Sequence, residues 1–245
     1  MRVASSQHKH QEKYFDRDMK TWENYHLEPW QNSFLQRLRE SFLKKGYKGK
    51  LLLDVGAGSG YVSVEMAKLG MEVIALDLSR QAVSNLEKFK KQYKLFNLKP
   101  VLGKAEKINL KDASVDYLVG NAILEHIVAE EETIIEWKRV LKKDGRIYIT
   151  VPIKFRYIWP WFWPVNYIHD RRIGHLRRYD KVTLERKFGM NVEKVYYTGH
   201  LVKTIWVLMS LFVKSRKMDE LMEKLDAKLN NFAYGASNIS VVLVK

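Results

Sequence analysis

Short continuous hydrophobic runs alternate along the chain with longer stretches in which apolar residues recur every three or four positions. Continuous apolar runs are typical of strands buried on both faces of a parallel sheet, and the three-to-four spacing is typical of amphipathic helices. The runs predicted as strands are 51–55, 72–76, 100–102, 115–119, 147–151, 192–197 and 239–244. Their alternation with helical segments predicts an α/β fold.

The helical spacing is clearest before the first strand and near the end of the chain. Five apolar residues predict an amphipathic helix that leads into the sheet: Phe34, Leu35, Leu38, Phe42 and Leu43. Segments 80–93 and 131–141 predict helices after the second and fourth strands. The strongly apolar segment 201–213 and the periodic residues up to 229 predict one long helix or two broken ones.

The first strand stops in a glycine-rich turn within LLLDVGAGSG, residues 51–60. Gly56, Gly58 and Gly60 remove side chains, so the backbone can turn tightly and approach a ligand. Residues 61–69 then continue as a helix. A strand, a glycine turn and a helix in this order are typical of a site for a nucleotide-type cofactor.

The charge beside this turn predicts which cofactor binds. Asp54 stands two residues before the first glycine, where it would repel the pyrophosphate of a dinucleotide. S-adenosylmethionine instead carries an ammonium and a sulfonium, which a carboxylate attracts. The second strand ends at Asp77, which is placed to accept hydrogen bonds from both ribose hydroxyls. We therefore predict a site for S-adenosylmethionine.

Four motifs, in order, carry a family resemblance: LLLDVGAGSG, VIALDLS, VDYLVGNAILEHI and KKDGRIYITVP. Across roughly residues 45–200 the chain resembles class I S-adenosylmethionine-dependent methyltransferases, and most closely the type-11 group, which includes quinone-biosynthesis and other small-molecule or lipid methyltransferases. The resemblance implies a doubly wound, seven-stranded Rossmann-like sheet whose last strand is antiparallel, with helices on both faces. A cofactor-free α/β turn and an oxidoreductase Rossmann domain are the alternatives.

The resemblance also implies how the chain is divided. Residues 1–48 would form a helical lid over the cofactor, with aromatic residues that could equally fill the edge of the core. Residues 49–245 would form the methyltransferase domain. Within it, 153–180 would be an aromatic-rich insert on the acceptor side after the fifth strand, and 201–232 a helical insert. Pro160 and Pro164 disfavour a regular helix in the first insert.

The predicted cofactor-binding residues come from the glycine turn, the strand ends and the lid. They are Asp54, Gly56, Ala57, Gly58, Gly60, Asp77, Leu78, Ala105, Glu106, Asn121, Ala122, Tyr14 and Trp22. Lys104 stands where family members often have an aspartate that reaches towards the adenine amino group. The Ala105 backbone or the Glu106 carboxylate would replace that contact, unless these charged side chains are simply solvated.

Methyl transfer from a sulfonium needs no proton on the leaving group, so positioning can supply much of the catalysis. A general base is needed only if the acceptor loses a proton, and the candidates are His126, His169, His175 and Tyr179. His126 could equally brace the following helix. The chain has no Cys, and no two of its seven His show H-x-x-x-H spacing, so the spacing gives little support for a metal site.

The net charge of +15 predicts attraction to polyanions, namely nucleic acid, an anionic membrane surface or phosphorylated substrates. Residues 154–187 hold nine basic and three acidic residues beside three tryptophans, Trp159, Trp161 and Trp163. This insert could contact a membrane, or its tryptophans could pack inward. The first residues lack the apolar core of a signal peptide, so we expect a cytoplasmic protein, with peripheral contact at the inner membrane surface as a further expectation.

The preferred function is methylation of a small-molecule or lipid-like acceptor. An RNA methyltransferase that uses the basic surface is the first alternative, although the N/D-P-P-Y motif typical of base-amine methylation is replaced here by residues 120–123, GNAI. A non-catalytic cofactor-binding domain is the second. Damage at Gly56, Gly58 or Asp77 would mark it, and all three are intact.

Overall fold

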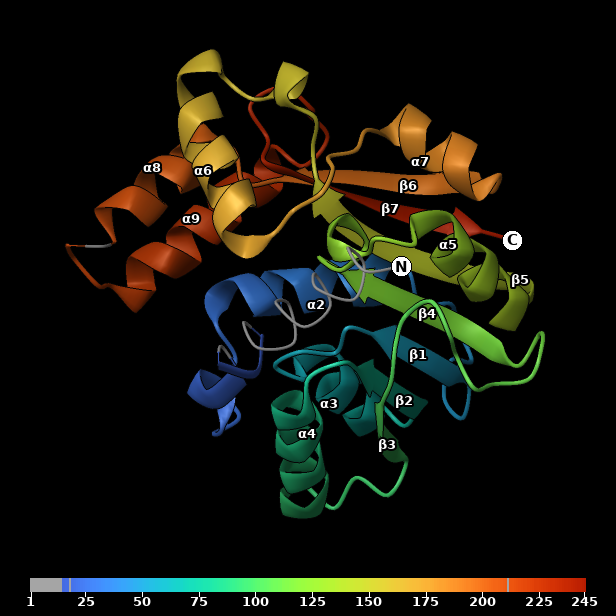
Figure 1. The fold of residues 1–245 in the computed structure, drawn as a ribbon. Coiled ribbons are helices and arrows are strands. Elements are labelled where there is room, and N and C mark those ends of the chain that lie inside the picture. Colours follow the sequence, from blue (N-terminus) through green and yellow to red (C-terminus); the bar gives the residue numbers. More distant parts are fainter. Residues whose placement is uncertain (1–14, 18, 211) are drawn as a thin grey trace.

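One sheet of seven strands organises the protein (Figure 1). The computed structural model describes residues 15–17, 19–210 and 212–245. The strands are β1 (Leu51–Val55), β2 (Glu72–Asp77), β3 (Leu98–Leu102), β4 (Val115–Asn121), β5 (Leu141–Pro152), β6 (Asn191–Thr198) and β7 (Asn238–Val244). Their order is β3-β2-β1-β4-β5-β7-β6, and β7 is antiparallel to both neighbours while the other pairs are parallel. This confirms the predicted doubly wound sheet and its antiparallel last strand.

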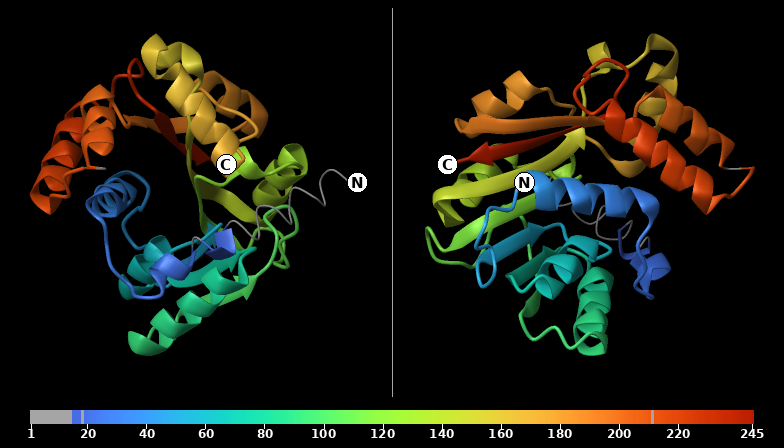
Figure 2. Two further views of the ribbon diagram at one scale, coloured as in Figure 1. Left: turned by 60° about the vertical axis from the view of Figure 1, so that its left-hand side comes forward. Right: turned by 180° about the vertical axis from the view of Figure 1, so that it is seen from behind.

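Helices cover both faces of the sheet (Figure 2). They are α2 (Pro29–Ser41), α3 (Tyr61–Lys68), α4 (Arg80–Gln92), α5 (Glu130–Val140), α6 (Trp163–Ile173), α7 (Lys181–Phe188), α8 (Leu201–Met209) and α9 (Arg216–Lys228). Short 3₁₀ helices in the described part of the chain are η1 (Lys20–Trp22), η2 (Leu124–His126), η3 (Phe155–Tyr157) and η4 (Pro160–Phe162). The segment 201–229 is thus two helices, not one.

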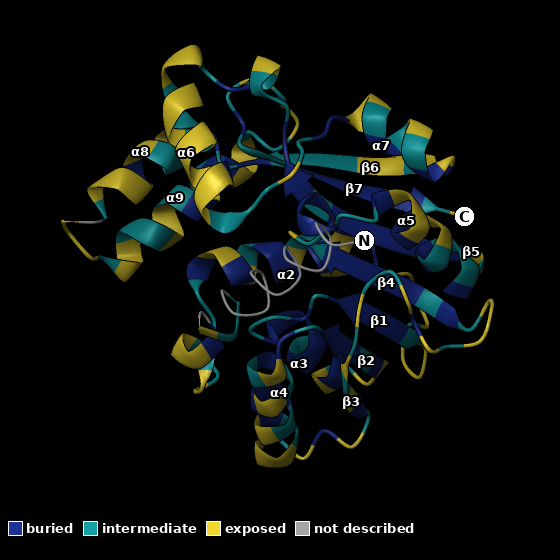
Figure 3. Ribbon diagram, viewed as in Figure 1, coloured by how far each residue is buried: buried dark blue, intermediate teal, exposed yellow. Residues whose placement is uncertain are grey.

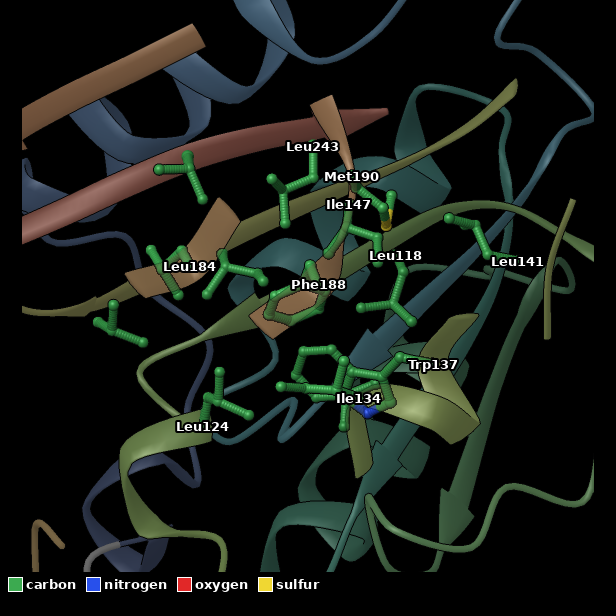
Figure 4. Close-up of a cluster of buried hydrophobic side chains, with 14 of the residues drawn as sticks. Leu118, Leu124, Ile134, Trp137, Leu141, Ile147, Leu184, Phe188, Met190 and Leu243 are labelled. Atoms are coloured by element: carbon green, nitrogen blue, oxygen red, sulfur yellow. The ribbon is translucent and has the colours of Figure 1, made fainter. Parts of the chain in front are cut away.

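Alternate residues of the central strands face two separate hydrophobic clusters. Leu52 packs with α2, α3 and α4, whereas Leu53 packs with α5 and α7 on the opposite face. Figure 4 shows the second cluster, in which Trp137 and Phe188 lie against residues of β4 and β5. Because the central strands are covered on both faces, their sequences are mostly apolar without a regular alternation.

The insert after β5 contains a regular helix, so the prediction from its prolines was wrong for residues 163–173. Pro164 lies in the first turn of α6, and Pro160 begins η4. A proline in a first turn costs no hydrogen bond, because the N–H it lacks has no intrahelical partner there. Gly174, with φ of +80°, ends α6 in the left-handed conformation that glycine adopts freely.

The described part of the N-terminal segment folds back onto α4. The Asn85 amide donates to the Met19 carbonyl at 2.8 Å, and the Lys88 ammonium donates to the Glu23 carbonyl at 2.9 Å. The next helix, α2, is capped at its N-terminus by a capping box: the Glu28 side chain accepts the Gln31 backbone N–H, and the Gln31 side chain accepts the Glu28 backbone N–H.

Among the described residues, no helix is both long and apolar enough to cross a membrane.

Candidate active site

A cavity of about 330 Å³ opens at the carboxyl ends of β1, β2 and β4. Ligands bind at this edge in open α/β sheets, because the strand order reverses between β1 and β4. Ten of the residues predicted to bind cofactor line it: Gly56, Ala57, Gly58, Asp77, Leu78, Ala105, Glu106, Asn121, Ala122 and Trp22. Asp54 and Gly60 are absent from its wall, and Tyr14 lies outside the described residues.

The glycine turn is shaped by left-handed backbone angles. Gly58 has φ of +51°, and a Cβ built there would meet only the Gly56 carbonyl oxygen, at 3.8 Å. The space in front of Gly58 is therefore kept open by the lack of a side chain. Gly60 has a different task, because its Cβ would lie 2.7 Å from a Leu86 methyl group. Its lack of a side chain allows α3 to pack closely against α4.

Asp77 holds the turn and still has acceptor capacity. One carboxylate oxygen accepts the Gly58 N–H and the other accepts the Ser79 N–H, both at 2.8 Å. Each ionised oxygen can accept about two hydrogen bonds, so each retains capacity for a ribose hydroxyl. Burial raises the pKa of Asp77, and the backbone hydrogen bonds oppose that rise. The two backbone hydrogen bonds hold the Asp77 side chain in a defined orientation at the cavity wall.

Asp54 lies beneath the turn, where only 2% of its surface is exposed. The Ser63 hydroxyl donates to its carboxylate at 2.6 Å. Burial nevertheless raises the pKa of Asp54 to about 7. Because Asp54 does not line the cavity, its charge would act on a ligand electrostatically across the glycine turn.

The N-terminal segment closes the cavity from the side of α4. Phe15, Met19, Trp22 and Trp30 all contribute to the wall. The Trp22 ring stacks on His26 with centroids 4.7 Å apart. Met19 was not predicted from the sequence, because a single methionine between charged residues carries no periodic signal.

Only one of the three principal catalytic candidates lines the cavity. His126 forms part of the wall, and burial, with the nearby His175, lowers its pKa to about 4. His175 lies outside the wall, with Nδ1 2.7 Å from an Asp170 oxygen. The Tyr179 hydroxyl is buried and donates to Glu130 at 2.8 Å, and burial together with Glu130 raises its pKa. A Tyr179 phenolate is therefore disfavoured at neutral pH.

A second cavity, of about 450 Å³, adjoins the first. Trp30, Asn121 and Ala122 line both cavities, so the two share a wall at the end of β4. The second cavity lies between α2, α8 and α9 and the adjoining ends of β5 and β7. It is lined by aromatic, apolar and charged side chains, among them Arg37, Lys203 and Trp206.

Residues 53–149 match the sequence family described as Methyltransferase domain. The matched segment contains the glycine turn, Asp77 and the end of β4, which form most of the first cavity. These residues form a class I methyltransferase domain of the type-11 group. S-adenosylmethionine is the cofactor of this domain.

Two curated relatives illustrate the sequence similarity of the methyltransferase domain. The biotin biosynthesis bifunctional protein BioHC of Cellvibrio japonicus is 32% identical over 99 residues, which are 40% of this chain and 19% of that protein. The ubiquinone biosynthesis O-methyltransferase of Pelagibacter ubique is 34% identical over 99 residues, which are 40% of each chain. The chain spans less than half the length of the curated relatives it matches first.

The fold of the methyltransferase domain is shared more widely than its sequence. The crystal structure of the YcgJ protein from Bacillus subtilis superposes with a TM-score of 0.61 at 16% identity, over 87% of this chain and 98% of that one. At this identity the likeness shows the fold alone.

The residues present fit S-adenosylmethionine. The open space at Gly58 admits a ligand against the turn, and the two Asp77 oxygens retain acceptor capacity for its ribose. The Ala105 carbonyl already accepts a hydrogen bond from the Trp137 indole at 3.2 Å. An adenine contact at this position would therefore use the Ala105 N–H or the Glu106 carboxylate, both of which belong to cavity-lining residues.

Proposed function

We propose that the protein transfers the methyl group of S-adenosylmethionine to a small-molecule or lipid-like acceptor held in the second cavity. The observation that carries this proposal is the shared wall at Trp30, Asn121 and Ala122. A cofactor in the first cavity and an acceptor in the second would meet there. S-adenosylmethionine supplies an electrophilic methyl group on a sulfonium. The chain's task is to hold the two reactants in line and to exclude water.

Cofactor binding in this proposal uses the predicted residues. The turn from Gly56 to Gly60 presents its backbone, and Asp77 accepts from the ribose. Asp54 contributes negative charge from below the turn. The predicted role of Tyr14, which lies outside the described residues, stays a prediction. His126 lines the first cavity and its low pKa keeps it neutral, so it is the candidate base for an acceptor whose reacting atom reaches into that cavity.

One charged side chain of the second cavity, Arg37, favours an acceptor with an anionic group, although the wall also holds Glu28, Asp219 and Glu223. Lys203 is neutralised by Glu223 at 2.6 Å, and Asp219 accepts the Trp206 indole N–H at 2.7 Å. Arg37, in contrast, forms no ion pair with a carboxylate in the part of the chain that the structure describes, and its Nε has no hydrogen-bond partner. An anionic substituent beside Arg37 would satisfy it.

Arg37→Met is expected to lower methyl transfer at least tenfold without changing cofactor affinity, because a charge-assisted hydrogen bond contributes about 1.5 kcal/mol or more. The measurement uses radiolabelled S-adenosylmethionine with total lipid, small-metabolite and RNA extracts. Arg39→Met is the matched control, because Arg39 lies on the same helix but pairs with Glu65 outside the cavity. Label in RNA alone would replace this proposal with the RNA alternative, and label in no fraction would favour a non-catalytic domain.

The protein is expected to bind S-adenosylmethionine and its demethylated product, and to bind NAD much more weakly. The reason is Asp54 beneath the turn: its pKa of about 7 leaves it partly ionised, the ionised form attracts the cationic cofactor and repels a pyrophosphate, and a bound cation favours that form. Isothermal titration calorimetry with each ligand measures the difference. An affinity for NAD equal to that for S-adenosylmethionine would contradict the assignment.

We also propose that the protein contacts an anionic membrane surface through η4, α6 and α8. Trp161 and Phe212 are 64% and 89% exposed, so the inward-packing alternative is wrong for Trp161. Figure 3 shows exposed residues along α6 and α8. Trp159 stacks on Trp161 and contacts the Tyr234 ring, with centroids 4.8 Å apart, so η4 packs against the loop that precedes β7. Residues 201–217 carry four basic and no acidic residues, which suits anionic headgroups.

Phe212→Ser is expected to lower the partition coefficient onto anionic vesicles roughly tenfold, since an aromatic side chain would no longer enter the bilayer. Flotation with phosphatidylglycerol-containing and pure phosphatidylcholine vesicles measures it. Phe96→Ser is the matched control, because Phe96 is also 89% exposed but follows α4. Equal loss in both variants, or a Phe212-dependent dimer without flotation, would remove the membrane proposal.

A further inference from the structure

Three side chains with metal-binding atoms converge beside the first cavity. Glu125 and His126 lie on η2, and His175 follows α6. One ligand atom from each lies within 4.8 Å of the others. Glu125 and His126 are 1% and 5% exposed, so the cluster is enclosed, while His126 also lines the cavity.

The orientation of His175 is set by neighbours behind it. Its Nδ1 lies 2.7 Å from Asp170, and the Arg178 guanidinium donates to both Asp170 oxygens at 2.6 and 2.8 Å. Arg178 is itself fixed by the Ile153 carbonyl at 3.0 Å. A carboxylate that holds one imidazole nitrogen leaves the other directed at a ligand, which is how metal-binding histidines are supported. Here Nε2 faces Glu125, at 3.6 Å from its Oε1.

One carboxylate oxygen of Glu125 is left unsatisfied. This atom, Oε2, is buried and has no hydrogen-bond partner within the described part of the chain. Leaving a buried polar atom without a hydrogen-bond partner is destabilising, so such atoms are rare and can mark the place of a bound water or ion. Two ligands on one tetrahedral ion, each about 2.1 Å from it, lie about 3.4 Å apart, close to the separation of Glu125 and His175.

We propose that Glu125, His126 and His175 bind one divalent transition-metal ion of the zinc class. Two imidazoles and one carboxylate form a donor set found in catalytic zinc sites, whereas magnesium prefers oxygen ligands alone. The fourth coordination position of the ion would face the first cavity, because His126 lines that cavity. A bound ion there would take the place of the proton-accepting role of His126 and would instead polarise, as a Lewis acid, an acceptor oxygen that reaches the first cavity; this consequence rests on the proposed function. The binding itself does not, so it is tested without methyl transfer.

The test uses full-length protein without a histidine tag, treated with EDTA and dialysed. Calorimetry with Zn²⁺ is expected to show about one ion per chain. Co²⁺ is expected to give the visible absorption of a tetrahedral site. Glu125→Gln keeps the side-chain shape and is expected to weaken Zn²⁺ binding at least tenfold. His169→Ala is the matched control: its ring centroid is 6.0 Å from that of His175, but it is not part of the cluster.

His175→Asn provides a second variant, checked with Glu125→Gln for folding by circular dichroism. Weaker Zn²⁺ binding and loss of the Co²⁺ spectrum in a folded variant, with His169→Ala unchanged, would support the site. Absence of stoichiometric binding in the wild type would overturn it. Wild-type affinity in folded Glu125→Gln and His175→Asn would also overturn it, because the ion would then bind elsewhere.

Discussion

Asp77→Asn is expected to weaken S-adenosylmethionine binding by roughly tenfold to a hundredfold while the protein remains folded. A hydrogen bond to a charged acceptor contributes about 1.5–3 kcal/mol, and tenfold in affinity corresponds to about 1.4 kcal/mol. Asparagine keeps the shape but replaces one acceptor oxygen with a donor. It also weakens the hold of that oxygen on the Gly58 or Ser79 N–H. Both the ribose contact and the turn are therefore affected.

Calorimetry with S-adenosylmethionine and its demethylated product measures this effect. Glu72→Gln is the matched control, because Glu72 begins the same strand and its side chain is exposed. The control is expected to bind like the wild type, and both variants should unfold at temperatures close to that of the wild type. An unchanged dissociation constant for Asp77→Asn would show that the ribose does not bind at the end of β2.

Asp54→Asn is expected to stabilise the protein, and more at alkaline than at acidic pH. Burial raises the pKa of Asp54 from its ordinary 3.8 to about 7, so the folded protein holds a proton that the unfolded chain releases. Stability from this group is therefore fully present below pH 3.8 and is lost as pH rises to about 7. The asparagine variant does not titrate. Its advantage should grow by about 2.5 kcal/mol between pH 5 and pH 8.

Urea unfolding of the cofactor-free protein at both pH values measures this difference. Asp144→Asn is the control, because Asp144 is exposed and its φ of +62° suits asparagine as well as aspartate. A pH-independent difference between wild type and Asp54→Asn would mean that the Asp54 carboxylate is ionised in the folded protein throughout this range. Weaker cofactor binding by the same variant would show that function requires this destabilising charge.

The sheet and the turn could be predicted because their signals are local. The apolar run from Leu51, the three glycines and the acidic end of β2 lie within a few tens of residues, and each element forms where its own residues favour it. The cofactor cavity then follows from strand order. The prediction from the prolines of the insert was wrong because the energetic cost of a proline in a helix depends on its position within that helix. Pro164 lies where that cost is absent.

By itself, the sequence determined the α/β class and the glycine turn, since backbone conformation there depends on near neighbours. Only the tertiary structure decided which distant side chains meet. It placed Arg37 and Lys203 around one cavity, and it brought His175 to Glu125 across the insert. It also decided that Asp54 is buried, which shifts its pKa. Contacts between segments far apart in the chain depend on tertiary packing, as does the burial that they cause. A local sequence pattern does not predict this packing.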